Sequence, residues 1–263
     1  EYSEYSELAP RDVVSRAIFF EINKSVDNNV YLDLRHIESD YIMKRFSNIY
    51  NFCLSSGIDA TKDLIPVAPA AHYTIGGVRT GLYGETNIRG LFACGEVACT
   101  AVHGANLLAS NSLLECVVFA KRAVDGARDI LSDDTNSTCN IDDFLSSDLN
   151  FEYSESQSKS LSGHKKAVSQ ILNSDVGIVR TKEGLLSAIS KIEETSQSLE
   201  EFSGYYRLKL NMVIDVSLLI AKSALIREES RGVHIREDYP QEDKSWENHI
   251  VIRKGEHPLF TAV

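Results

Sequence analysis

The sequence predicts a mixed α/β or α+β fold that is followed by a helical bundle. In the first half, short β-rich apolar runs next to glycines alternate with amphipathic helical patterns. From residue 161 onward the apolar spacing is helical almost to the end, and a segment rich in serine and acidic residues separates the two halves. With 263 residues, of which 43 % are hydrophobic, the chain can form one large domain or two ordinary ones.

The first 60 residues combine two predicted helices with a short strand. An apolar stripe that begins at residue 9 predicts a helix with Pro10 in its first turn and Arg11 beside it. On the residues alone, Arg11 is more simply interpreted as a solvated helix side chain than as a ligand. A β-rich alternation predicts a strand over 30–34, and an amphipathic pattern predicts one helix over 38–55.

Residues 66–121 are rich in glycine and in polar side chains. The patterns predict strands over 72–78 and 91–94, with a turn between them, and a helix that starts near residues 104–106 and reaches about residue 130. The second strand stops at a Gly-Glu pair, and a strand followed by such a pair, a loop and a helix is typical of a nucleotide-cofactor domain. Glycines allow a backbone to come close to a bound molecule, so this stretch indicates a ligand site.

The second half begins with a segment that cannot form a core. Residues 132–162 contain nine serines and seven acidic residues but one basic residue, which predicts a solvated linker. Helical patterns follow over 161–178, 181–202 and 206–226, and the last is apolar on more than one side, as in a buried member of a bundle. An alternating pattern over 248–253 predicts a final strand.

Composition limits the classes of function. The net charge of −11 argues against nucleic acid or an anionic membrane as the main partner, although a few local arginines can still form an anion pocket. Apolar runs stay shorter than a transmembrane span, so no transmembrane segment is expected. The acidic, polar start is unlike a signal or transit peptide and more like an internal cut than a natural start.

The five cysteines form an odd set without a C-x-x-C pair. They therefore predict free thiols in a reducing compartment, either the cytoplasm or an organelle interior such as a plastid or mitochondrion. Cys94 and Cys99 lie too far from other ligand types to predict a metal site.

Several charged side chains could bind a small dicarboxylate if they converge, because guanidinium groups pair bidentately with carboxylates. The candidates are Arg11, His72, His103 and the cluster of Arg231, His234 and Arg236. A single histidine in a loop is more often a structural hydrogen-bond donor, so for both His72 and His103 the two interpretations stay open. The sequence contains no G-x-G-x-x-G, P-loop or H-E-x-x-H motif, and no nucleophile elbow.

Six ordered segments carry a family resemblance. They are ELAPRDVVSRAI (7–18), PAAHYTIGGV (69–78), GLFACGEV (90–97), HGAN (103–106), ASNSLLE (109–115) and ESRGVH (229–234). The chain resembles the L-aspartate oxidase family, FAD-dependent flavoproteins related to succinate dehydrogenase and fumarate reductase, over roughly 7–130 and 165–245. The segments AAHYT and ASNSLLE resemble aspartate oxidase more than succinate dehydrogenase.

The resemblance implies roles for individual residues and FAD as the cofactor. Arg11 matches the family's catalytic arginine, and His72, with Tyr73 beside it, matches the histidine that binds a substrate carboxylate. His103 opens the loop that is expected to line the substrate site. Glu96 matches the acid that holds the ribityl chain of the flavin, and Ser112 and Leu113 match the pair beside the flavin ring. Two neighbours, Gly95 and Asn111, complete the residues expected to bind FAD.

The resemblance also implies a domain organisation. It divides the chain into part of a capping domain (1–60), the C-terminal segment of an FAD-binding domain (61–131), the Ser/acidic linker (132–160), a C-terminal helical bundle (161–230) and a charged tail (231–263). The dinucleotide-binding half of the family is missing, so the expected partner is an N-terminal flavoprotein half or another protein subunit.

One position departs from the family. Leu107 stands where HGAN is normally followed by an arginine that binds the second substrate carboxylate. Three hypotheses therefore stay open. The chain is the C-terminal half of an L-aspartate oxidase, which converts L-aspartate to iminoaspartate for NAD synthesis; it is a degenerate, non-catalytic flavoprotein-like subunit; or it is a dicarboxylate oxidoreductase of the succinate/fumarate branch.

Overall fold

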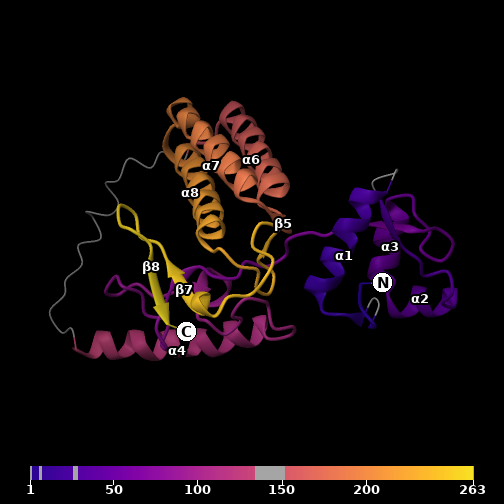
Figure 1. Ribbon diagram of the computed structural model, residues 1–263, viewed down its shortest axis with the longest axis horizontal. Coiled ribbons are helices and arrows are strands. Elements are labelled where there is room, and N and C mark those ends of the chain that lie inside the picture. Colours follow the sequence, from indigo (N-terminus) through magenta and orange to yellow (C-terminus); the bar gives the residue numbers. More distant parts are fainter. Residues whose placement is uncertain (1, 6–7, 26–28, 134–151, 263) are drawn as a thin grey trace. The chain divides into compact units, whose positions relative to one another are not determined.

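The computed structural model describes residues 2–5, 8–25, 29–133 and 152–262, and they form two compact units, residues 1–72 (unit 1) and residues 73–263 (unit 2). The structure confirms the predicted mixture of helices and small sheets (Figure 1). Its strands pair in four two-stranded sheets, and none of these is a large central sheet. The described part of the chain therefore contains no complete nucleotide-binding fold.

Unit 1 contains three short helices and one two-stranded sheet. Its elements are α1 (Arg11–Lys24), β1 (Val30–Leu32), α2 (Ser39–Arg45), α3 (Ser47–Ser55) and β2 (Ile65–Val67), with β1 antiparallel to β2. The helix after Pro10 is confirmed. The single helix predicted over 38–55 is wrong, because Phe46 leaves the helical conformation (φ −121°, ψ 36°) and packs its ring edge-on against Tyr41. No glycine or proline signals this break in the sequence.

The first part of unit 2 has little regular strand structure. It contains β3 (Val78–Arg79), the 3₁₀ helix η2 (Gly95–Val97), β4 (Ala98–Cys99) and α4 (Ser112–Asp133), with β3 parallel to β4. The strand predicted over 72–78 is wrong before residue 78, because Gly76 and Gly77 have φ angles of +98° and +134°. In the strand predicted over 91–94, only Phe92 forms a β-bridge, to Glu85.

Helix α4 begins at Ser112, so the start predicted near residues 104–106 is wrong. The preceding loop turns at three residues with positive φ, Ala101 (67°), Gly104 (56°) and Ser110 (66°). An α-helix needs negative φ throughout, so it cannot begin before the last of these positions. The apolar Leu107 and Leu108, which suggested an earlier start, therefore lie in the loop.

The helical bundle is confirmed, and it holds the closed core of the molecule. Figure 1 draws its helices α6 (Glu155–Asp175), α7 (Lys182–Thr195) and α8 (Gly204–Ile226) side by side. In the chain, the 3₁₀ helix η3 (Ser196–Glu201) connects α7 to α8. Thr181 caps α7 by accepting a hydrogen bond from the Gly184 amide at 3.1 Å. Helix α6 starts before residue 161, so the last residues of the predicted linker are helical; residues 134–151 of that linker lie outside the described residues.

The chain ends in two further sheets. Strand β5 (Val179–Arg180) is parallel to β6 (Ile235–Arg236), and after the 3₁₀ helix η4 (Lys244–Trp246) strand β7 (Asn248–Val251) is antiparallel to β8 (Leu259–Ala262). The sequence predicted one final strand, which β7 confirms, but it missed the partner strand β8.

Four cysteines of the described part, Cys53, Cys94, Cys99 and Cys116, are free thiols, whereas Cys139 lies outside the described residues. Within the same part of the chain, no group of histidine, cysteine, aspartate and glutamate side chains could hold a metal ion. None of the described helices is long and apolar enough to cross a membrane.

Candidate functional site

A buried carboxylate organises the start of α4. The side chain of Glu115 is 1 % exposed, and its oxygens accept hydrogen bonds from the Tyr73 hydroxyl at 2.9 Å, from His103 Nε2 at 2.8 Å and from the Thr100 hydroxyl. These donors come from three separate segments of unit 2. Burial alone would raise the pKa of Glu115, but the three hydrogen bonds outweigh it and hold the pKa below its ordinary value. The carboxylate is therefore ionised, and both of its oxygens accept hydrogen bonds from within the protein.

The two aromatic partners of this carboxylate also contact each other. The rings of Tyr73 and His103 meet edge to face, with centroids 5.5 Å apart. Burial and the bond to Glu115 raise the pKa of Tyr73 to about 12, so its hydroxyl remains a donor at neutral pH. His103 Nδ1 accepts a hydrogen bond from the Leu108 amide at 3.3 Å. Both ring nitrogens are thus occupied, and His103 lies inside this part of the site instead of on its surface.

The predicted ribityl-binding acid lies on an ordered surface loop. Glu96 belongs to η2, its side chain is exposed, and its Oε1 accepts a hydrogen bond from the Thr74 amide at 2.8 Å. Gly95 is buried, has φ +74°, and a Cβ there would lie 3.2 Å from Cys116 Sγ on α4. Glycine therefore lets the loop pack closely against α4 while Glu96 faces outward.

The remaining predicted cofactor residues lie where α4 begins. The Asn111 carbonyl accepts the first helical hydrogen bond, from the Glu115 amide at 2.8 Å. The amides of Ser112, Leu113 and Leu114 consequently point out of the helix without helical acceptors. Ser112 is half-buried, whereas Leu113 is 79 % exposed. The helix start thus offers donors next to an uncovered apolar side chain.

Two predicted site residues belong to unit 1. Arg11 is the exposed first residue of α1, and the exposed His72 is the last residue of unit 1, directly before Tyr73 in the chain. Their predicted roles in catalysis and substrate binding remain predictions.

The cluster of Arg231, His234 and Arg236 does not serve a dicarboxylate, so the hypothesis that it joins the site is wrong. Arg231 pairs with the fully buried Glu229 through Nε and Nη2, at 3.0–3.1 Å. The buried Arg236 donates from Nη1 to three carbonyls at the end of α8, those of Ala224, Leu225 and Arg227, and from Nε and Nη2 to Asp238. These cations stabilise the end of the bundle.

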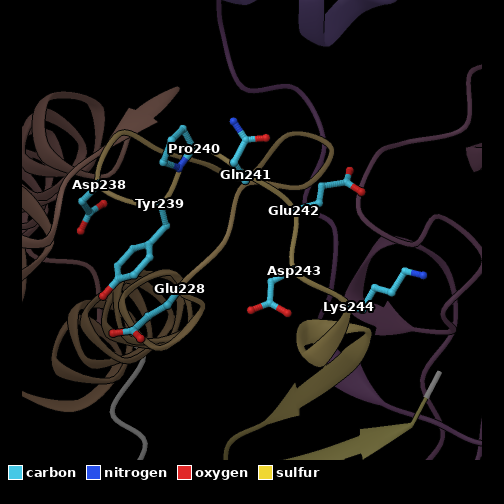
Figure 2. Close-up of a pocket in the computed structure, with 8 residues that line it drawn as sticks. All are labelled: Glu228, Asp238, Tyr239, Pro240, Gln241, Glu242, Asp243 and Lys244. Atoms are coloured by element: carbon cyan, nitrogen blue, oxygen red, sulfur yellow. The ribbon is translucent and has the colours of Figure 1, made fainter.

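A surface depression on the C-terminal loop is also unsuitable for an anion. Figure 2 shows its lining, which includes four carboxylates and one ammonium group: Glu228, Asp238, Tyr239, Pro240, Gln241, Glu242, Asp243 and Lys244. The excess of negative charge repels carboxylate and phosphate groups. The predicted cofactor residues lie elsewhere, in η2 and at the start of α4.

The donor set around α4 fits part of a flavin. Carboxylates accept hydrogen bonds from hydroxyl groups, and an outward-facing Glu96 on an ordered loop suits a polyol chain. Outward-pointing amides at the start of α4 suit an electron-rich ring edge, and Leu113 offers apolar surface beside them. No large sheet with a glycine-rich turn for a pyrophosphate is present in the described residues. The residues thus fit the ring and ribityl portion of FAD but not its adenine portion.

Comparison with known protein families points to the same cofactor. Residues 4–113 match the family described as FAD binding domain, and residues 165–260 match the family described as fumarate reductase flavoprotein C-term. The two matches identify a flavoprotein whose cofactor is FAD.

Two curated relatives with similar sequences are L-aspartate oxidases. The chain is 40 % identical to the chloroplastic L-aspartate oxidase of Oryza sativa over 265 residues, and 39 % identical to the L-aspartate oxidase of Acinetobacter baylyi over 245 residues. The chain belongs to the FAD-dependent flavoprotein family of L-aspartate oxidase and the fumarate reductase flavoprotein. These alignments include 95 % and 91 % of the chain but only 41 % and 44 % of the relatives. The chain therefore spans less than half the length of either relative.

Solved structures show the same relationship. The chain superposes on a quinol-fumarate reductase structure with menaquinol with a TM-score of 0.81 at 30 % identity, covering 100 % of this chain and 51 % of the other. A variant of the E. coli quinol fumarate reductase FrdA gives a TM-score of 0.76 at 30 % identity, covering 98 % and 49 %.

Sequence reasoning assigned no role to Glu115, although it is the most connected polar residue of the site. A signal was present, since Glu115 is an acid inside the apolar run SLLECVVF, within the first turn of a helix. An acid on an apolar helix face requires hydrogen-bond partners from other segments.

Proposed function

We propose that this chain provides one side of the flavin and substrate site of an L-aspartate oxidase, which oxidises L-aspartate to iminoaspartate for NAD synthesis. The observation that supports this proposal is a pair of hydrogen bonds in unit 2. Glu96 accepts one from the Thr74 amide, and Glu115, beside the start of α4, accepts the other from the Tyr73 hydroxyl. This arrangement gathers the last two residues of AAHYT and the motifs GEV, HGAN and SNSLLE around one helix start. The identity to L-aspartate oxidases supports the choice of substrate.

When bound, FAD would supply the acceptor for the hydride removed from the substrate. Glu96 would hold the ribityl chain, and the amides at Ser112 and Leu113 would face the electron-rich ring edge. Arg11 and His72 would bind and orient the substrate. Arginine has a pKa above about 12, so Arg11 acts more readily as a carboxylate ligand and proton relay in a closed site than as a free base.

The partner in this proposal is a polypeptide with the dinucleotide-binding half of the flavoprotein. Helix α4 supports it, because its outer face carries Leu113, Val117, Val124 and Leu131, which are 79 %, 69 %, 59 % and 74 % exposed. The last three recur every seven residues, which is the spacing of a helix face that packs against another element. The bundle core, in contrast, is closed, since Leu185, Ile192 and Leu210 are each 0 % exposed. The apolar surface is thus uncovered where the FAD-binding domain is incomplete.

Leu107 favours a second function, a non-catalytic flavoprotein-like subunit. The side chain is half-buried in the loop between His103 and α4, at the position where the family has its second carboxylate-binding arginine. Loss of a buried charge pair weakens binding by about 2–5 kcal/mol, so aspartate would bind poorly. The succinate/fumarate alternative is weakened equally, because a second substrate carboxylate must be bound there too.

Co-expression with a dinucleotide-binding half tests the proposal. The chain is produced with the N-terminal half of the Acinetobacter baylyi relative, and the co-purified complex is examined for flavin absorbance and then for flavin reduction by aspartate and by succinate. Aspartate-dependent reduction supports the oxidase, and succinate-dependent reduction the other branch. Bound flavin that neither substrate reduces supports the non-catalytic subunit, and a complex without flavin contradicts the proposal.

The proposed docking face has its own control. Val124→Asp places a charge on the outer face of α4 and should abolish co-purification, since a buried unpaired carboxylate is costly. Val216→Asp makes the same change at a valine that is 54 % exposed on α8 and should leave co-purification intact. Equal behaviour of the two variants would contradict the docking face.

An organelle interior is the compartment we propose, since two plant relatives are named chloroplastic.

A further inference from the structure

The carboxylate of Glu115 is an unusual group to bury, because its partners are neutral donors instead of a lysine or arginine. Removing an ionised carboxylate from water is unfavourable unless every lone pair finds a donor. Here Tyr73 and His103 share Oε2 while Thr100 binds Oε1, so the group is satisfied by three segments at once. A packing role alone would be filled better by an apolar side chain of similar length. The arrangement therefore indicates a role in fixing what surrounds the carboxylate.

The hydrogen bonds of His103 determine its tautomer. The Leu108 amide can only donate, so His103 Nδ1 must be the acceptor of their 3.3 Å hydrogen bond. The ring proton is then on Nε2, where it points to Glu115 Oε2 at 2.8 Å. The carboxylate stabilises this tautomer, and the ring in turn holds the Leu108 amide. Glu115 is thus connected to Leu108, at the far end of the loop, by two hydrogen bonds through the His103 ring.

The loop fixed in this way contains Leu107, the one position of the site that departs from the family. Residues 103–108 lie outside the helices and strands, and apart from local turns their backbone is anchored by the Val233 amide, which donates to the Ala105 carbonyl at 3.0 Å. On the other side of the carboxylate, Tyr73 follows directly after the proposed substrate residue His72. One side chain therefore connects both proposed substrate segments to the first turn of α4.

We propose that Glu115 is a positioning residue: it holds His103 in the Nε2–H tautomer and thereby fixes the loop 103–108 and the segment after His72 relative to the start of α4. The name of the site that this loop lines rests on the proposed function, but the tautomer and the order of the loop do not. An experiment can therefore contradict the positioning role of Glu115 without contradicting the proposed function, and the reverse.

Two variants of equal length separate positioning from packing. In Glu115→Gln, the amide oxygen can accept from Tyr73 and His103, and the amide group can donate to the Thr100 hydroxyl. Glu115→Met keeps the length but offers no comparable acceptor. If Glu115 only packs, Glu115→Met should leave the His103 tautomer and the loop as in the wild type. If Glu115 positions the loop, only Glu115→Gln should do so.

The first measurement is nitrogen NMR of the full chain with ¹⁵N-labelled histidine, in which the His103 signals are assigned by their absence in His103→Gln. The wild type and Glu115→Gln should show a single tautomer with an unprotonated Nδ1. Glu115→Met should show a mixture of tautomers, and exchange of the Leu108 amide should accelerate about tenfold, as for the loss of one hydrogen bond. Fluorescence of Trp246 verifies that the bundle remains folded in each variant.

The second measurement uses the complex with the dinucleotide-binding half and records the fraction of flavin retained after gel filtration. Glu115→Met should lower it severalfold, and Glu115→Gln should leave it near the wild-type value. A protonated Nδ1 in the wild type, or an unchanged tautomer and Leu108 exchange in Glu115→Met, would overturn the positioning role. A wild-type complex without flavin would overturn the proposed function, and the NMR result alone would then decide the role of Glu115.

Discussion

The end of the bundle contains a histidine that should make the fold sensitive to mild acid. His234 Nδ1 lies 2.7 Å from Arg180 Nη1, and its Nε2 lies 3.3 Å from the Arg227 carbonyl oxygen. Since a guanidinium only donates, Nδ1 is the acceptor and Nε2 carries the proton. Burial, and then the positive charge of Arg180, lower the pKa of His234 from its ordinary 6.5 to about 4. Protonation would place two cations in contact.

The sign and size of the effect follow from linkage. The folded-state pKa lies below the unfolded value, so as the pH falls below 6.5 the unfolded chain binds a proton before the folded chain does. The stability present above pH 6.5 is therefore lost progressively as the pH falls towards 4. The full difference corresponds to about 3 kcal/mol, of which about 2 kcal/mol should be lost by pH 5.

Urea unfolding monitored by Trp246 measures this loss. This residue is the only tryptophan of the chain, and its ring packs against the Arg227 guanidinium and the Phe260 ring, so its fluorescence reports the same region. The matched variant His234→Asn retains an acceptor for Arg180 but does not titrate. Between pH 8 and pH 5 the wild type should lose about 2 kcal/mol more than this variant. Equal losses in the two proteins would refute the assignment of the acid sensitivity to His234.

Three further predictions concern other contacts. Arg236→Met should destabilise the bundle by about 3–5 kcal/mol in urea unfolding, because Asp238 and the carbonyls at the end of α8 lose their donor, whereas the exposed Arg253→Met should cost less than about 1 kcal/mol. An effect of similar size in both would contradict the capping role. Gly232→Ala should lower the unfolding midpoint more than Gly255→Ala; both have positive φ (58° and 81°), but only at Gly232 would a Cβ meet a backbone oxygen, at 2.2 Å. Leu107→Arg, in the complex with the dinucleotide-binding half, should improve aspartate binding by about 2–5 kcal/mol in a titration of flavin reduction, and no improvement would indicate that other parts of the substrate site have also changed.

The bundle could be predicted from the sequence because its signals are local. Helices α7 and α8 have regular apolar spacing, and Thr181 caps α7 as its residue type predicts. Their core closes with residues of α6, α7, α8 and the connections between them, so no segment of the first half is needed to form it.

The first half was predicted less well, because its conformation depends on contacts between distant segments. Residues 72–77 have a β-like composition, but they are fixed by Tyr73 and Thr74 binding acids 42 and 22 positions further along the chain. The start of α4 was misplaced because Ser110 adopts positive φ, which its residue type rarely does. Glu115 was overlooked for the same reason, since its partners are neighbours in space and not in sequence.

The outer face of α4 has a consequence for how much of this protein a cell can maintain. In the proposed assembly a partner polypeptide covers Val117, Val124 and Leu131, so a copy made without it would present a row of apolar side chains to the solvent. Such surfaces recruit chaperones and proteases, which remove proteins whose partners are missing. We therefore expect the level of this chain to follow the level of the proposed partner, so that one uncovered helix face would adjust the supply of one polypeptide to that of the other.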